Sequence, residues 1–254
     1  MKDKLLSVGR SSLSFIGLVL VWWLVTALNL ISRAYLPGPA QVGEAFVQGV
    51  MDGSLFQNLW ISLIRLLGTY AVASVLGIAA GVAMGLVPNQ GRFFRPILSF
   101  FNSLSGITWL PLAIAWFGIG TLTIGFVIFN SVFFIVAFNT LVGVQSVPKV
   151  FEHAMLTMGS SRLRMIRDAM IPGAMPNIIT GLRLAMGFGW RALIAVEMVA
   201  GSIGMGYMIF NASYIFRQDI IVMGILVVGV AALAIDQLLF APLERRTIER
   251  WGMV

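Results

Sequence analysis

The chain has 254 residues, of which 59% are hydrophobic and 11% are charged, and its mean hydropathy is +0.93. This balance excludes an ordinary soluble domain and predicts a polytopic membrane protein. His153 is the single histidine, there is no cysteine, and the acidic residues form no cluster. The sequence therefore does not indicate a metal site.

Charge-free runs divide the chain into membrane-spanning segments. Charge is absent from residues 11–32, 66–91 and 96–148, which are stretches of 22, 26 and 53 residues. About 20 helical residues cross a hydrocarbon core roughly 30 Å thick, so these runs hold one, one and two spans. Two more spans are expected over about 177–200 and 220–243. We therefore predict an all-α bundle of about six transmembrane helices.

The first predicted span, Leu13 to Ile31, follows three basic residues and resembles the apolar core of a signal peptide. It exceeds the usual length of about 7 to 15 residues and lacks a small-x-small cleavage site, which favours an uncleaved span. Pro37 and Pro39 end this helix, and residues 40–51 are expected to lie along the outer surface.

The second and third spans contain residues that alter helix packing. Small residues in the second span predict close helix contact; they are Gly77, Ala79, Ala80, Gly81, Ala83 and Gly85. Residues 88–96 are expected to form a tight inside turn. Gly106, Trp109 and Pro111 should then kink or break the third span, either for structural reasons or because the break borders a pathway.

The basic residues predict the orientation of the chain. With six spans and the N-terminus inside, the inside segments carry 12 of the 17 basic residues: Lys2, Lys4, Arg10, Arg92, Arg95, Lys149, Arg162, Arg164, Arg167, Arg245, Arg246 and Arg250. The positive-inside rule therefore places both termini and the 149–176 loop in the cytoplasm. The net charge of +7 is accordingly interpreted as a topology signal, and no nucleic-acid partner is expected.

The 149–176 loop holds seven ionisable residues in 28 and predicts two short helices. The apolar face of the first consists of Val150, Phe151, Ala154, Met155 and Met158. Gly159 is expected to end that helix, Ser160 or Ser161 to cap the next, and Pro172 to stop it. Such a pair suits either a groove on a partner or the surface of anionic lipid, and periodicity alone leaves both open.

The spacing of this loop resembles the signature of ABC-importer permeases, which reads E-A-A, three residues, Gly, nine residues, then I-x-L-P. Gly159 and Pro172 are separated by the required 13 positions, and Ala154 matches the first alanine. His153 stands at the glutamate position, and Glu152 lies one residue earlier.

Motifs elsewhere resemble the nitrate, sulfonate, taurine and bicarbonate branch of these permeases. They are Leu36-Pro37-Gly38-Pro39, Trp109-Leu110-Pro111-Leu112, Trp116-Phe117-Gly118-Ile119-Gly120, Gly181-Leu182-Arg183, and Gly189-Trp190 followed by Glu197. The resemblance implies a type I importer permease in the bacterial inner membrane, with 1–254 as one permease domain. It also implies a second copy of the permease, two cytoplasmic ATPase subunits and an external substrate-binding protein as partners.

The resemblance makes 149–176 the ATPase-docking loop. Its expected docking residues are Glu152, His153, Ala154, Met158, Gly159, Ser160, Ser161, Arg162 and Pro172. The chain has no G-x-x-x-x-G-K, so it forms no Walker A phosphate site. We therefore expect a transport subunit rather than an enzyme, with no cofactor of its own and with ATP and magnesium in the partner ATPase.

Four residues are candidates for the pathway of a small anionic solute: Trp109, Trp190, Arg191 and Glu197. An ionised group within a span costs roughly 2.5 to 3.5 kcal/mol, so Arg191 and Glu197 should face protein or water. They point about 120° apart on one helix and should not pair. Arg191 either meets an anion through its forked donors or has a structural partner.

Two other classes of function compete with an ATP-driven permease. A self-contained secondary transporter or channel requires ion-coupling carboxylates within the spans, and the sequence offers Glu197 and Asp236. An intramembrane enzyme requires an activated nucleophile or a carboxylate pair, and the sequence indicates neither.

Overall fold

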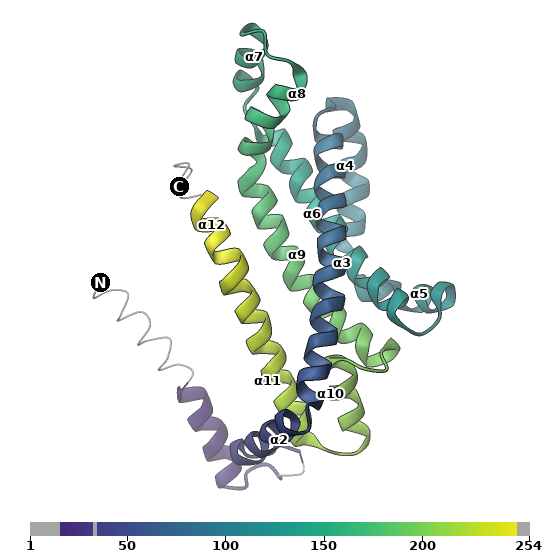
Figure 1. The fold of residues 1–254 in the computed structure, drawn as a ribbon, viewed down its shortest axis with the longest axis vertical. Coiled ribbons are helices and arrows are strands. Elements are labelled where there is room, and N and C mark those ends of the chain that lie inside the picture. The colour runs from purple at the N-terminus through teal and green to yellow at the C-terminus, as the bar shows by residue number, and fades with distance from the viewer. Residues whose placement is uncertain (1–15, 33–34, 248–254) are drawn as a thin grey trace, which may run out of the picture.

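The computed structural model describes residues 16–32 and 35–247, and the regular structure in that part of the chain is helical. Figure 1 shows an elongated bundle whose long helices run between two ends. One end carries α7 (Lys149–Thr157) and the other carries α2 (Pro39–Met51). We refer to them as the α7 end and the α2 end.

Four helices of the described chain are long and apolar enough to cross a membrane, and a bent pair of helices makes a fifth segment if it is counted as one span. Four are continuous helices: Ser54–Gly85, Thr121–Ser146, Arg162–Ala200 and Gln218–Glu244. The fifth is a pair of helices, Phe93–Ser103 and Gly106–Phe117, bent by 86°. These five match the second to sixth predicted spans. The predicted first span lies partly outside the described residues, and its described part contains the apolar helix Ile16–Ala27.

Three helices form the centre of the bundle: α3 (Ser54–Gly85), α6 (Thr121–Ser146) and α9 (Ile171–Ala200). Helix α6 packs against both α3 and α9, and it is apolar around most of its circumference. Leu66, Ile128 and Leu193, one from each helix, are fully buried in the shared core. In lipid such helices associate through close packing rather than through exclusion of water.

The predicted close packing of the second span is confirmed. Gly77, Gly81 and Gly85 recur at every fourth residue of α3 and face α6. A Cβ atom at Gly81 would lie 2.6 Å from Cβ of Thr140 and 2.7 Å from the carbonyl oxygen of Ala137. Because these distances are too short for carbon, glycine is required for the observed approach of the two helices.

We expect Gly81→Ala to lower the stability of the detergent-solubilised protein by about 1 to 3 kcal/mol, because the added methyl group forces α3 and α6 apart. The matched control is Gly68→Ala on the same helix, where no atom lies within 4 Å of the added Cβ. Thermal unfolding of the two variants measures the difference. Equal losses in both would show that the helix contact does not depend on glycine.

The predicted break in the third span is confirmed. Helix α4 (Pro88–Ser103) is followed by the short helix η1 (Gly106–Trp109) and by α5 (Leu110–Phe117). Pro111 lies in the first turn of α5, where its missing N–H costs no helical hydrogen bond. Gly106 brings η1 onto α6, since a Cβ there would overlap the side chain of Ser131.

The expected inside turn over residues 88–96 is wrong, because these residues form the first part of α4. Pro88 occupies the first turn of that helix, a position where the fixed φ of proline favours helix formation. The turn is confined to Leu86 and Val87, between α3 and α4. Pro96 lies inside α4.

The two helices predicted after Lys149 are present, but Pro172 does not end the second. Gly159 has φ of +73°, and the Ser161 hydroxyl accepts a hydrogen bond from the backbone N–H of Arg164 at 3.4 Å. Helix α8 (Arg162–Met165) then continues through a π turn, η2 (Ile166–Met170), into α9. A proline ring clashes with the carbonyl four residues earlier, and here that carbonyl belongs to the wider π turn.

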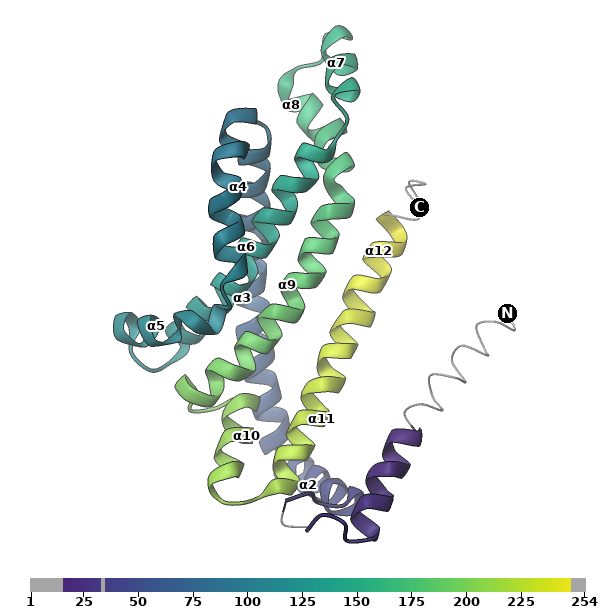
Figure 2. The ribbon, with the colours of Figure 1, turned by 180° about the vertical axis from the view of Figure 1, so that it is seen from behind.

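The chain after α9 returns along the bundle. A turn at residues 201–204 leads to α10 (Met205–Tyr214) at the α2 end, which packs against α9 and α11 (Gln218–Ile235). Helix α11 continues through a π turn, η3 (Asp236–Phe240), into α12 (Ala241–Thr247). Figure 2 shows α11 and α12 as one nearly straight segment beside α9.

Candidate functional site

Glu197 of α9 is fully buried and forms the centre of a polar junction near the α2 end. Its carboxylate accepts hydrogen bonds from the Ser62 hydroxyl at 2.7 Å, the Arg65 guanidinium at 3.0 Å and the backbone N–H of Gly206 at 3.1 Å. A buried carboxylate is tolerated when it is paired and hydrogen-bonded in this way. The junction therefore connects α3, α9 and α10.

The same junction fixes the turn between α9 and α10. Arg65 also donates to the carbonyl oxygen of Ile203 at 2.6 Å, and Asn58 accepts from the backbone N–H of Gly204 at 2.8 Å. Gly204 has φ of +133°, and a Cβ there would overlap the Glu197 carboxylate. These contacts give Glu197 a structural role, and its buried carboxylate faces no open surface.

A second ion-pair group, Arg183 with Asp236 and Glu244, joins α9 to η3 and α12. Arg183 donates to both oxygens of Asp236 at 2.7 Å and to Glu244 at 2.7 Å. This fork-to-carboxylate geometry orients the guanidinium as well as neutralising it. Both acids are therefore occupied by Arg183.

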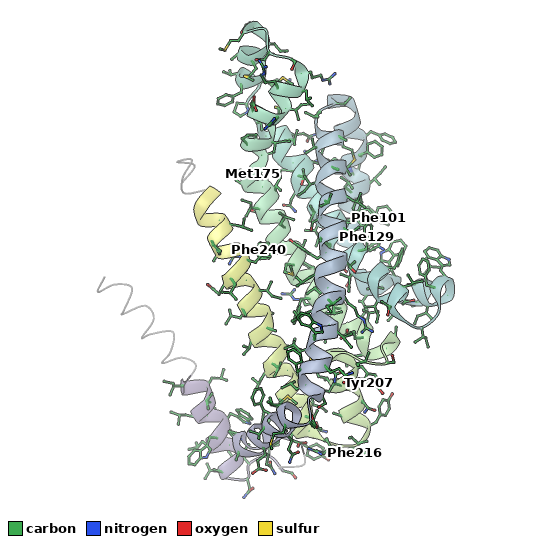
Figure 3. The ribbon with its side chains drawn as sticks, viewed as in Figure 1. Phe101, Phe129, Met175, Tyr207, Phe216 and Phe240 are labelled. Carbon is green, nitrogen blue, oxygen red and sulfur yellow. The ribbon has the colours of Figure 1, made fainter. Side chains whose placement is uncertain are left out.

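A cavity of about 390 Å³ lies where the break between α4 and η1 meets α6 and α9. Its polar lining comes from three segments and consists of Asn102, Ser103, Ser105, Asn130, Ser131 and Arg191. Its aromatic lining includes Phe101, which Figure 3 places at mid-height of the bundle. Interrupted backbone within a membrane is found where protein or a water-filled cavity satisfies its polar groups.

Of the four predicted pathway residues, Arg191 alone lines this cavity. Trp109 is not among the lining residues, but its ring stacks on that of the lining residue Phe101, with ring centroids 5.9 Å apart. Trp190 is 6% exposed and belongs to the central core, while Glu197 belongs to the buried junction. As expected, Arg191 does not pair with Glu197, whose ionic partner is Arg65.

Arg191 lies on an exposed face of α9, which borders cavities rather than packing closely against another described helix. Thr180, Leu184, Gly187, Phe188 and Arg191 recur at helical spacing, and all five are exposed. The Arg191 guanidinium lies over the Phe188 ring, 5.4 Å from its centroid. We call these five residues the uncovered face of α9. A guanidinium facing hydrocarbon is costly, so this face must border another protein chain or water.

The helices α7 and α8 project beyond the rest of the bundle (Figure 1). Large apolar side chains on these helices and on the turn between them are exposed: Val150 by 73%, Met158 by 81% and Leu163 by 77%. A cavity of about 590 Å³ separates this projection from the ends of α3 and α6, and among the described residues that line it three are basic and none is acidic. These residues are Arg95, Lys149 and Arg162. Exposed apolar groups beside uncompensated cations are typical of a protein interface.

The predicted docking residues are spread over this projection and its base. His153, Ala154, Met158, Gly159, Ser161 and Arg162 are exposed, and Ser160 is half-buried. Pro172 lies apart from them, half-buried within the first turn of α9. The side chain of Glu152 lies outside the described part of the structure.

The apolar helices, the interrupted third span and the glycine-packed core are typical of an integral membrane protein. Residues 73–247 match the family described as the binding-protein-dependent transport system inner membrane component. This match covers more than half of the chain, and the protein belongs to that family.

Curated relatives agree with this assignment. The taurine transport system permease protein TauC of Escherichia coli is 37% identical over 242 residues, which cover 93% of this chain and 88% of the relative. The putative aliphatic sulfonates transport permease protein SsuC of Bacillus subtilis is 28% identical and covers 92% and 84%. The nitrate import permease protein NrtB of Leptolyngbya laminosa is 30% identical and covers 74% and 67%.

A solved structure supports the fold. The MetNI methionine ABC transporter in inward-facing conformations matches with a TM-score of 0.50 and 17% identity, over 69% of this chain and 92% of that chain. The family resemblance and the type I importer permease fold expected from the sequence are thereby confirmed, and the chain is a transport permease.

Proposed function

We propose that this chain is the permease subunit of an ATP-driven importer and passes a small anionic solute, such as a sulfonate, taurine or nitrate. It works with a second copy of itself, two cytoplasmic ATPase subunits that hold ATP and magnesium, and an external substrate-binding protein. The names of the relatives support the solute class. The observation that carries the proposal is the uncovered face of α9, where Arg191 requires protein or water opposite it.

In this proposal the uncovered faces of two copies border a shared pathway. The basic residues of α7, α8 and η2 favour a cytoplasmic position for the α7 end. ATP binding would then draw the ATPase subunits together, and the projecting helices would pass that motion to α9 through the continuous segment Arg162–Ala200.

The paired carboxylates favour this proposal over a secondary transporter or channel. Glu197 and Asp236 were the acids that the sequence offered for ion coupling, and each forms an ion pair with an arginine of another helix. A carboxylate held by arginine is a poor site for reversible binding of a proton or sodium ion, because the arginine charge already compensates it.

Single cysteines test the pathway, since the native chain has none. We expect Leu184→Cys, on the uncovered face of α9, to react with a membrane-impermeant thiol reagent in the assembled transporter. The control is Val230→Cys on α11, which is 67% exposed in the isolated chain and is expected to face lipid. Equal labelling of the two cysteines, or labelling of Val230→Cys alone, would overturn the proposed position of the pathway.

A further inference from the structure

We propose that the cavity at the α4–η1 break binds the anionic head group of the transported solute, with Arg191 supplying the charge. This inference rests on the proposed function and adds to it a binding site within the membrane domain. The site would hold a sulfonate, nitrate or similar oxyanion while the solute crosses.

The charge of the cavity selects an anion. Arg191 is the one ionisable residue among its fifteen lining residues. In the described part of the chain Arg191 forms no ion pair, whereas Arg65, Arg183 and Arg217 each pair with a carboxylate. Arg191 also borders a neighbouring cavity that contains Asp236 and Glu244, but Arg183 occupies both of these acids. Its guanidinium is therefore available to a ligand.

Neutral donors lie around this charge. The Asn130 amide donates one N–H to the carbonyl oxygen of Phe126 at 2.9 Å, which leaves its second N–H for a ligand. Asn102 and Ser105, from the two sides of the helix break, form no side-chain hydrogen bond with the described residues. Oxyanions of sulfur and nitrogen carry several acceptor oxygens, and a guanidinium fork with nearby amides matches that pattern.

Two other polar residues of the cavity contribute less. The hydroxyl groups of Ser103 and Ser131 donate to the backbone carbonyls of Ser99 at 2.8 Å and Val127 at 2.9 Å. Their protons are thus already engaged, and only lone pairs remain to face the cavity. Arg191, Asn130, Asn102 and Ser105 are therefore the proposed ligand-binding residues.

The remaining walls suit the organic part of such a solute. Phe101, Phe134 and Phe188 come from α4, α6 and α9, and the guanidinium of Arg191 rests against Phe188. Cavities of about 300 to 1,000 Å³ with apolar walls and a few polar groups are typical of small-molecule sites. The volume of about 390 Å³ falls in this range.

Protection of an introduced thiol tests the site. Ile107→Cys, which lines the cavity and is not among the proposed ligand-binding residues, is introduced into the permease–ATPase complex in lipid nanodiscs, and its rate of maleimide labelling is measured with added ethanesulfonate. Ethyltrimethylammonium and ethanol at constant ionic strength serve as cationic and neutral controls. We expect ethanesulfonate alone to slow labelling, and Arg191→Gln to raise the concentration needed by about tenfold or more. Arg191→Lys should retain part of the protection, because the charge remains and the fork is lost.

The following outcomes decide the proposal. The labelling rate of Ile107→Cys without ligand should be the same with arginine or glutamine at position 191, which shows that the cavity is intact. Protection that persists in Arg191→Gln, or equal protection by the cation, would overturn the anion site. If ATP-driven uptake by Arg191→Gln is normal while protection is lost, the site is not on the pathway and the proposed function still stands. If the native complex shows no ATP-driven uptake, the proposed function itself fails.

Discussion

Replacing Glu197 with alanine is expected to destabilise the protein by about 3 to 5 kcal/mol, because the change leaves Arg65 buried without its counter-charge. The side chain of Arg65 is 12% exposed, so water cannot replace the lost carboxylate. Ser62 and Gly206 would lose their acceptor at the same time. The expected readout is a large fall in the midpoint of thermal unfolding in detergent.

Two comparisons separate this effect from the general loss of an ion pair. Asp219→Ala removes the acid of the ion pair with Arg217 at the α2 end, where the Arg217 side chain is 45% exposed. This change should lower the stability by about 0 to 1 kcal/mol. The double variant Arg65→Met with Glu197→Leu removes both charges and should recover much of the stability lost in Glu197→Ala. Equal effects at Glu197 and Asp219 would contradict the assignment of a buried junction.

Introducing charge on the projecting helices is expected to abolish binding of the ATPase while leaving the permease inserted and folded. Met158, which directly follows α7, is 81% exposed, and Leu163 of α8 is 77% exposed. Aspartate at both positions places two carboxylates in an interface that is proposed to be apolar, which should weaken binding by orders of magnitude. Co-purification of the ATPase with a tagged permease measures the loss.

The matched control is Met51→Asp, which changes an equally exposed methionine, 82% accessible, at the α2 end. This variant should co-purify the ATPase normally. Deletion of Thr157 to Arg162 provides a stronger form of the same test, since it removes the turn that joins α7 to α8. Normal ATPase binding by the deletion variant would disprove docking at this surface.

The spans and their interruption could be predicted from the sequence because they depend on local properties. The length of a charge-free run is set by the thickness of the hydrocarbon core that the helix crosses. A glycine and a proline close together in such a run, here Gly106 and Pro111, predict a break in the helix. The cap at Ser161 and the turn at Gly159 are likewise local, and both are present in the structure. Two predictions were wrong: a turn was expected where α4 begins, and Pro172 was expected to end a helix. Pro88 lies in the first turn of α4 and Pro172 follows a π turn, and both positions tolerate proline within a helix. Helix propensity alone does not distinguish such positions from a helix end.

The polar sites could not be predicted because they join distant parts of the chain. Arg65 and Glu197 are 132 positions apart, and Arg183 and Asp236 are 53 apart. The cavity combines residues from α4, α6 and α9, and Asn130 carries no motif that would single it out. Arg191 was identifiable in advance because a cation within a span requires a partner or water.

The most direct test of the proposed function is solute uptake by proteoliposomes that contain this permease and the ATPase and binding protein proposed as its partners. We predict that uptake of taurine or a related sulfonate requires ATP and the binding protein, and that it disappears when Met158 and Leu163 are both replaced by aspartate. Uptake that proceeds without the ATPase, driven by an ion gradient alone, would contradict the account and indicate a secondary transporter.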